Sequence, residues 1–176
     1  MSDSHGRTVG NTLVLGGARS GKSRHAQALA EASGGRLVFV ATAQAFDDEM
    51  NARIARHQAD RDARWLTVEA SIDLAAAIER MDAPGTTMLI DCLTLWASNL
   101  LLSDKAMDPQ LGMLLAAIRS ARGRLIIVSN EVGLGIVPDN ALARKFRDMA
   151  GTINQRVAAV VDHVHFIAAG LALTLK

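Results

Sequence analysis

The sequence predicts an α/β domain in which a mostly parallel β-sheet is covered by helices on both faces. Two observations carry this prediction. Short apolar segments of β-type composition alternate with segments of helical periodicity, the order that parallel strands and crossover helices require. The first apolar segment also runs into a glycine-rich loop and then an alanine-rich helix. Ligands of such sheets bind beyond the carboxyl ends of the strands, so we expect the functional site there.

The glycine-rich loop reads Gly16-Gly17-Ala18-Arg19-Ser20-Gly21-Lys22-Ser23 and has the spacing G-x-x-x-x-G-K-[ST] of a phosphate-binding loop. Glycines allow the positive φ values and the close approach that wrapping a triphosphate requires. Lys22 is expected to contact the β- and γ-phosphates, and the Ser23 hydroxyl to ligate Mg²⁺. The alternative, a glycine turn with an incidental lysine, is disfavoured by the flanking strand and helix. The loop therefore predicts a P-loop NTPase-type (RecA-like) fold and a nucleoside triphosphate ligand.

The composition predicts a single globular domain. The chain has 176 residues, of which 49% are hydrophobic and 21% charged, with a formal net charge of +1. Basic residues are interleaved with acids, so no nucleic-acid footprint is visible. Residues 1–11 are polar and are expected to form a disordered tail before a domain at 12–176. Cys92 cannot form an internal disulfide, and no apolar stretch reaches the roughly 20 residues of a membrane span, so we expect a cytoplasmic protein.

The remaining elements follow from periodicity and turn residues. After a first strand at 12–15, strands are expected at 36–41, 65–69, 86–91, 124–129, 164–168 and 171–175. Helices are expected at 23–32, 47–60, 71–81, 93–102, 110–121 and 139–162, with Ser71 and Asp139 as caps. Asp91 ends an apolar strand, the pattern that delivers a carboxylate to nucleotide-bound Mg²⁺. The alternative is that Asp91 caps the next helix.

The predicted helix at 47–60 carries His57, with Arg53 and Arg61 one helical turn before and after it. Taken alone, a helix histidine between arginines is more often a surface residue than a catalytic one. A neutral imidazole can attack phosphorus, however, and its unperturbed pKa of about 6.5 leaves it mostly neutral at pH 7. Flanking arginines oppose its protonation and can hold phosphate oxygens. The chain has no Asn-Lys-x-Asp element and no aromatic-plus-basic surface, which favours a small-molecule transferase.

Several strings along the chain are more specific than the phosphate loop alone. After that loop come Asp47-Asp48-Glu49-Met50 with Arg53-Ile54-x-x-His57-x-x-x-Arg61, Trp65-x-Thr67-Val68-Glu69, Asp91-Cys92-Leu93-Thr94, Asn130-Glu131-Val132-Gly133-x-Gly135-Ile136-Val137-Pro138 and Phe146-Arg147-Asp148-x-Ala150-Gly151-x-x-Asn154-Gln155. Together they resemble the bifunctional adenosylcobinamide kinase / adenosylcobinamide-phosphate guanylyltransferase family of cobalamin biosynthesis. The resemblance runs from about Thr12 to the C-terminus.

This resemblance implies two reactions that use ATP or GTP and Mg²⁺. An NTP phosphorylates adenosylcobinamide, and GTP then gives GMP through a histidine to adenosylcobinamide phosphate. The histidine carried over is His57. The guanine nucleotide site would be lined by Ala41, Thr42, Ala43, Gln58, Ala59, Asp60, Arg61, Glu69 and Asp91. Much of the family has a basic residue at the position of Gln58. This difference affects one expected phosphate contact and not the expected role of His57. The family also implies a ring-like trimer, with the helices at 93–102 and 110–121 as interface candidates.

Two other functions fit the residues by themselves. One is a P-loop kinase of another small alcohol, in which His57 is structural. The other is a nucleotide-switched binding module without turnover. His25, one turn after Lys22, is expected to pack behind the loop. His163 and His165 share one face of a strand, a pattern that by itself is weak support for zinc.

Overall fold

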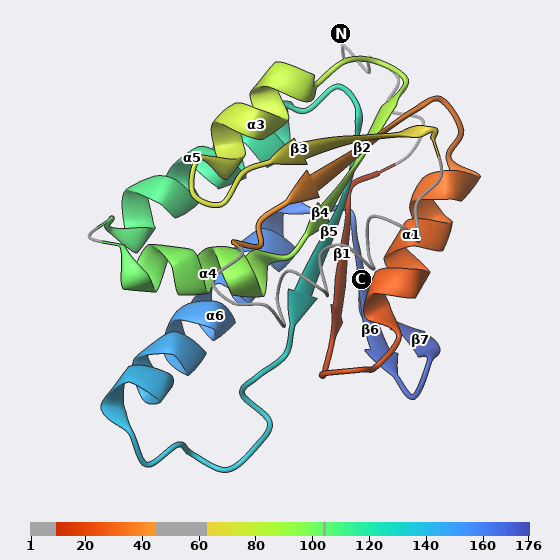
Figure 1. The fold of residues 1–176 in the computed structure, drawn as a ribbon. Helices are drawn as coiled ribbons and strands as arrows, with labels where there is room; N and C mark the ends of the chain where they lie inside the picture. Colours follow the sequence, from red (N-terminus) through yellow and green to blue (C-terminus); the bar gives the residue numbers. More distant parts are fainter. Residues whose placement is uncertain (1–9, 45–62, 104) are drawn as a thin grey trace, which may run out of the picture.

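The computed structural model describes residues 10–44, 63–103 and 105–176, which form one sheet with helices on both faces (Figure 1). The strands are β1 (Thr12–Gly16), β2 (Arg36–Ala41), β3 (Trp65–Glu69), β4 (Thr86–Asp91), β5 (Arg124–Asn130), β6 (His163–Ala168) and β7 (Leu171–Thr174). The helices are α1 (Lys22–Ala32), α3 (Leu74–Met81), α4 (Leu93–Leu102), α5 (Met107–Ser120) and α6 (Ala141–Val160). The helix expected at 47–60 lies outside the described residues. The described helices include none with the length and hydropathy needed to cross a bilayer.

The sheet confirms the predicted fold class. Its strand order is β3-β2-β4-β5-β1-β6-β7, and every neighbouring pair is parallel except β6 with β7. The turn between these two strands consists of Ala169 and Gly170, whose φ values of 51° and 80° suit a tight hairpin. The strand that carries the phosphate loop is thus central, between β5 and β6, as in RecA-like P-loop folds.

Alternate residues of each strand divide the core between the two faces of the sheet. On β1, Leu13 and Leu15 belong to the cluster that packs against α3, α4, α5 and α6, whereas Val14 belongs to the cluster that packs against α1. This is the period of two expected for a sheet buried on both sides. On the α1 face, Ala26 and Ala30 are fully buried, and these small side chains let the helix lie close to the strands.

The predicted helix caps were wrong by one or two residues. Asp73, not Ser71, is the N-cap of α3, and its side chain makes no capping hydrogen bond. For α6 the cap is Asn140, whose Oδ1 accepts from the N–H of Ala143 at 2.8 Å, rather than Asp139. Both Asp139 and Asn140 are good capping residues, so propensity alone does not separate them.

Helix α5 begins earlier than the sequence suggests. It starts at Met107 and includes Pro109, which lies just before the helix predicted at 110–121. Pro109 lies in the first turn, where a backbone N–H has no intrahelical partner, so its missing donor costs nothing there. Pro109 therefore lies inside the first turn of the helix and does not mark the residue before its start.

Asn11 is fully buried and does not belong to a disordered tail, contrary to the prediction for residues 1–11. Its amide donates to the carbonyl of Ile118 at 3.0 Å, and its Oδ1 accepts from the N–H of Leu125 at 3.0 Å. Its backbone N–H donates to Asp162 Oδ2 at 2.6 Å, and its carbonyl accepts from Asp162 and His163. Asn11, ahead of β1, thus joins α5, β5 and β6.

The turn between α5 and β5 is held by Asp82. Its carboxylate accepts from the backbone N–H groups of Arg122 at 2.9 Å and Gly123 at 2.8 Å, and from Arg122 Nε at 3.3 Å. Burial alone would raise the pKa of Asp82, but these hydrogen bonds and the charge of Arg122 bring the pKa below its usual value of 3.8. A Cβ at Gly123 would lie 2.5 Å from the carbonyl oxygen of Thr86, so the turn must pass close to β4.

We expect Asp82→Ala to lower the free energy of unfolding by about 1–3 kcal/mol, because the N–H groups of the buried Gly123 and of Arg122 lose their charged acceptor. The lowered pKa means that this stabilisation is present at neutral pH and is lost as the pH falls through the folded-state pKa. Chemical denaturation at pH 7 measures the change. The matched control is Asp139→Ala, an exposed aspartate, with an expected change of about 0.5 kcal/mol or less. Equal losses in both variants would contradict the role of Asp82.

Candidate nucleotide-binding site

The carboxyl ends of the parallel strands bring the predicted site residues to one edge of the sheet. Ala41 at the end of β2 pairs with Glu69 of β3 and with Asp91 of β4, so these three positions form one row. In β1 and β5, Gly16 pairs with Asn130 at the same edge. Strand β5 lies between β4 and β1, so Asp91 and the phosphate loop are separated by one strand.

The backbone of the phosphate loop needs glycine at the two positions that the motif specifies. Gly21 has φ 95°, and a Cβ at Gly16 would lie 2.6 Å from Ser20 Oγ and 2.7 Å from the carbonyl oxygen of Ile167. Arg19 also has a positive φ, of 56°. Positive φ values turn successive N–H groups to the same side of the chain, which forms a concave binding surface for anions. The loop therefore has the backbone that a phosphate ligand requires.

The start of α1 offers an open positive terminus. Its N-cap is Gly21, which makes no side-chain capping bond, and its first turn contains no acidic residue. The ammonium of Lys22 donates to the carbonyl of Gly17 at 3.3 Å, which holds the lysine over the loop. Ser23 is half-buried in the same turn. A helix N-terminus without an internal anion fits a bound phosphate, and Ser23 next to it fits the hydroxyl ligand of Mg²⁺.

Two neighbouring segments form hydrogen bonds with opposite ends of the phosphate loop. The N–H of Glu131, just after β5, donates to the carbonyl of Gly16 at 3.1 Å. In the β6–β7 turn, the N–H of Gly170 donates to the carbonyl of Ser20 at 2.9 Å. These bonds use carbonyl groups, so they fix the loop without consuming the N–H groups that would bind phosphate.

Thr42 is fully buried and is a structural anchor at the end of β2. Its hydroxyl accepts from the N–H of Cys92 and donates to the carbonyl of Cys92, both at 2.7 Å. Asn99 of α4 donates to the carbonyls of Thr42 at 2.8 Å and Ser71 at 2.9 Å. The hydroxyl and the carbonyl of Thr42 already have hydrogen-bond partners within the protein. Thr42 would therefore contribute to a nucleotide site by fixing the neighbouring residues in place, not by binding the nucleotide itself. Sequence reasoning missed Asn99, since no spacing in the chain links it to Thr42.

Asp91 is half-buried at the end of β4, and its carboxylate has no hydrogen-bond or ion-pair partner among the described residues. The N-cap of α4 is Cys92, without a side-chain capping bond, so the structure gives no support to the alternative that Asp91 caps this helix. Burial, followed by the charge of Asp91, raises the pKa of the Cys92 thiol to about 11, so the thiol stays protonated at neutral pH. Glu69 is exposed.

His25 packs behind the phosphate loop, as predicted, and contacts β6. Its Nε2 lies 3.1 Å from Nδ1 of His165. Burial, together with the charges of His25, His163 and Arg124, lowers the pKa of His165, so this imidazole is neutral at neutral pH. Within residues 10–44, 63–103 and 105–176, no three His, Cys, Asp or Glu side chains are grouped as metal ligands.

The predicted nucleophile lies outside the described residues. So do its arginine neighbours Arg53 and Arg61 and the other predicted nucleotide contacts in that segment, Gln58, Ala59 and Asp60. The described part of the site, from Gly16 to Ser23 with Ala41, Glu69 and Asp91, lies along one edge of the sheet, which we call the nucleotide rim. Its binding role and the role of His57 stay predictions.

Comparisons with known proteins identify the family of the chain. Residues 12–175 match the model of the family described as cobinamide kinase / cobinamide phosphate guanyltransferase. The bifunctional adenosylcobalamin biosynthesis protein CobP of Pseudomonas aeruginosa is 48% identical over 166 residues, covering 93% of this chain and 96% of that protein. CobU of Salmonella typhimurium is 41% identical over 179 residues, covering 93% and 98%.

A solved structure from Pyrococcus horikoshii OT3 supports the fold. It superposes with a TM-score of 0.57 at 11% identity and covers 95% of this chain and 86% of that one. At this identity the similarity concerns the fold alone. The family match, by contrast, spans the phosphate loop, the rim and the C-terminal hairpin. The chain belongs to the cobinamide kinase / cobinamide phosphate guanyltransferase family.

Proposed function

We propose that this chain carries out both reactions named in its family's description, phosphorylating adenosylcobinamide and then converting adenosylcobinamide phosphate to adenosylcobinamide-GDP. The observation that carries the proposal is the phosphate loop, whose glycines are required by its backbone and whose helix terminus is open to an anion. It occurs in a chain that matches the family over residues 12–175.

In the first reaction, the loop holds the triphosphate of ATP or GTP, and Lys22 contacts its β- and γ-phosphates. The hydroxyl oxygen of adenosylcobinamide attacks the γ-phosphorus. The bond from that phosphorus to the bridging oxygen breaks, the nucleoside diphosphate leaves, and the hydroxyl proton is released. Ser23 and Asp91 are the residues that would hold Mg²⁺, which neutralises phosphate charge when bound.

In the second reaction, a neutral nitrogen of His57 attacks the α-phosphorus of GTP and pyrophosphate leaves. A phosphate oxygen of adenosylcobinamide phosphate then attacks the same phosphorus, and the bond to His57 breaks as adenosylcobinamide-GDP forms. Splitting one displacement into two is nucleophilic catalysis. The carboxylates of Glu69 and Asp91 lie in one row with Ala41 and suit the N1–H and N2 donors of guanine or the metal.

The working form is proposed to be a cytoplasmic homo-oligomer, a trimer by resemblance to the family. Helix α4 is mostly buried within the chain, which leaves little of it for an interface. Its last residue, Leu102, is 66% exposed, and Met113 of α5 is 48% exposed. These apolar side chains are candidates for contact with a second copy.

The decisive experiment is labelling of the full chain with α-³²P-labelled GTP. We expect covalent label that survives alkali and is lost in acid, as phosphorus bonded to histidine nitrogen is, with release of one pyrophosphate for each GMP bound. Adenosylcobinamide phosphate should then remove the label as adenosylcobinamide-GDP. A protein that phosphorylates an alcohol but takes no label would be the simple kinase. A protein that binds GTP and releases no pyrophosphate with the corrinoid present would be the binding module.

A further inference from the structure

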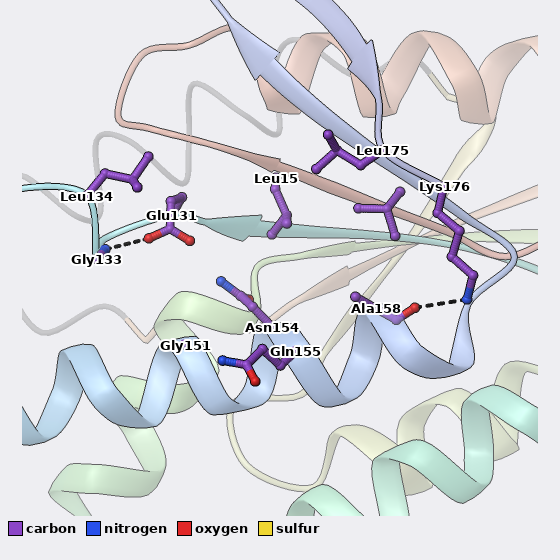
Figure 2. Close-up of a pocket in the computed structure, with 11 residues that line it drawn as sticks. Leu15, Glu131, Gly133, Leu134, Gly151, Asn154, Gln155, Ala158, Leu175 and Lys176 are labelled. Atoms are coloured by element: carbon purple, nitrogen blue, oxygen red, sulfur yellow. Dashed lines mark hydrogen bonds between the residues drawn. The ribbon is translucent and has the colours of Figure 1, made fainter.

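A groove lies beside the phosphate loop, on the face of the sheet that α6 covers (Figure 2). Its volume is about 530 Å³, within the range of small-molecule sites. One wall is α6, with Gly151, Asn154 and Gln155, and the other is formed by Leu15 of β1 and the segment after β5. Leu175 lines the end away from the loop. The nucleotide rim described above uses none of the α6 residues.

The groove adjoins the point where the phosphate loop begins. Leu15, in its wall, immediately precedes Gly16. Glu131, also in the wall, donates its N–H to the carbonyl of Gly16 at 3.1 Å. A molecule in the groove can therefore extend an arm over the sheet edge toward a γ-phosphate held by Lys22. Because the groove adjoins the phosphate loop, it suits the molecule that accepts the phosphoryl group better than it suits the nucleotide.

The wall combines apolar surface with amide groups. Asn154 is 6% exposed, and its amide donates to the carbonyl of Asn130 at 3.1 Å. Its Oδ1 is buried without a partner among the described residues. Gln155, next to it, is exposed at the mouth of the groove. A buried amide oxygen without a donor carries a desolvation cost, which a ligand N–H would remove.

Two sequence strings that the nucleotide site left unexplained meet in this groove. One is the glycine-rich segment 130–138, which contributes Glu131, Gly133 and Leu134. The other is the segment 146–155 of α6, which contributes Gly151, Asn154 and Gln155. Only residues 139–145 separate the two segments in sequence, and the fold places them face to face across the groove.

We propose that this groove binds the corrinoid, taking one edge of its ring with the peripheral amides against Asn154 and Gln155. The inference rests on the proposed function and names the place of its acceptor substrate. Cobinamide is a broad apolar ring edged with primary amides, and its reactive hydroxyl is on a flexible arm. The apolar wall suits the ring, the amide side chains pair with its amides, and the adjoining loop receives the arm.

Gly151 allows a sharp test, because a Cβ there would meet no atom within 4 Å. A Cβ can therefore be added there freely, and the ring of Gly151→Phe should occupy the groove; the substitution also removes a helix-weakening glycine from α6. We expect the KM for adenosylcobinamide in the kinase reaction to rise at least tenfold, while the KM for ATP changes less than twofold. The matched control is Ala159→Phe on the same helix, at an exposed position that does not line the groove, which should leave both KM values as in the wild type.

Gln155→Ala is the second variant, because its exposed side chain can be removed even if Gly151→Phe does not fold. We expect the KM for adenosylcobinamide to rise several-fold, again without a change for ATP. Wild-type values for the corrinoid in both groove variants would overturn the proposal. So would loss of the wild-type assembly size in Gly151→Phe, since the groove would then be an interface between copies. Failure of the proposed function is a different result: a wild-type protein that does not phosphorylate the corrinoid.

Discussion

Replacing His57 by alanine is expected to abolish covalent labelling by GTP and to reduce formation of adenosylcobinamide-GDP by at least about 10³-fold. No nitrogen remains to bond the α-phosphorus, so the only route left is direct displacement at an anionic centre without a covalent intermediate. Phosphorylation of adenosylcobinamide should fall by less than about threefold, because that reaction needs the γ-phosphate and not the imidazole. The two activities are measured separately, by corrinoid phosphate and by corrinoid-GDP formation.

The control for this variant is His163→Ala, which removes an exposed imidazole from β6. It should keep the label and both activities. Label that persists at wild-type level in His57→Ala would place the nucleophile elsewhere and refute the role assigned here to this residue.

Replacing Lys22 by alanine should impair both reactions together. The ammonium lies over the phosphate loop, 3.3 Å from the carbonyl oxygen of Gly17. Lys22 is the first residue of α1, and the N-terminus of a helix supplies only partial positive charge. Losing a full positive charge at the phosphates removes transition-state stabilisation in each displacement, and we expect each kcat/KM to fall by about 10²–10³. Covalent labelling by GTP should slow to the same extent, since it uses the same triphosphate site.

Arg24→Ala is the control, because it removes an exposed cation two residues after Lys22, in the first turn of the same helix. Its kcat/KM values should change by less than about threefold. A Lys22→Ala protein that loses only one of the two activities would show that the kinase and the transferase bind their triphosphates at different places.

The strands and the phosphate loop were predictable because their signals are local. The apolar runs at 36–41 and 86–91 appear as β2 and β4 with the same bounds, and the glycines of the loop have the conformations that the motif requires. Alternation of residues on β1 between two core clusters follows from strand geometry alone. The edge at which the site residues gather followed from the parallel arrangement.

The features that the sequence did not reveal depend on contacts between distant segments. Asn11 reads as part of a polar tail, yet it bonds to residues more than 100 positions away. Asn99 reads as one polar residue in an apolar helix, yet it fixes the end of β2. Gly151 and Asn154 were visible as part of a motif, but only the fold shows that they face the segment after β5. No periodicity in the chain encodes such pairings.

The N–H of Gly170 donates to the carbonyl of Ser20, so the β6–β7 hairpin is bonded directly to the phosphate loop. Lys176, after β7, in turn donates to the carbonyls of Ala158 and Val161, so the segment that follows the hairpin is bonded to the end of α6 as well. Substitutions that shift this hairpin are thus expected to reach both the triphosphate cradle and the helix beside it, although the hairpin is far from the phosphate loop in sequence.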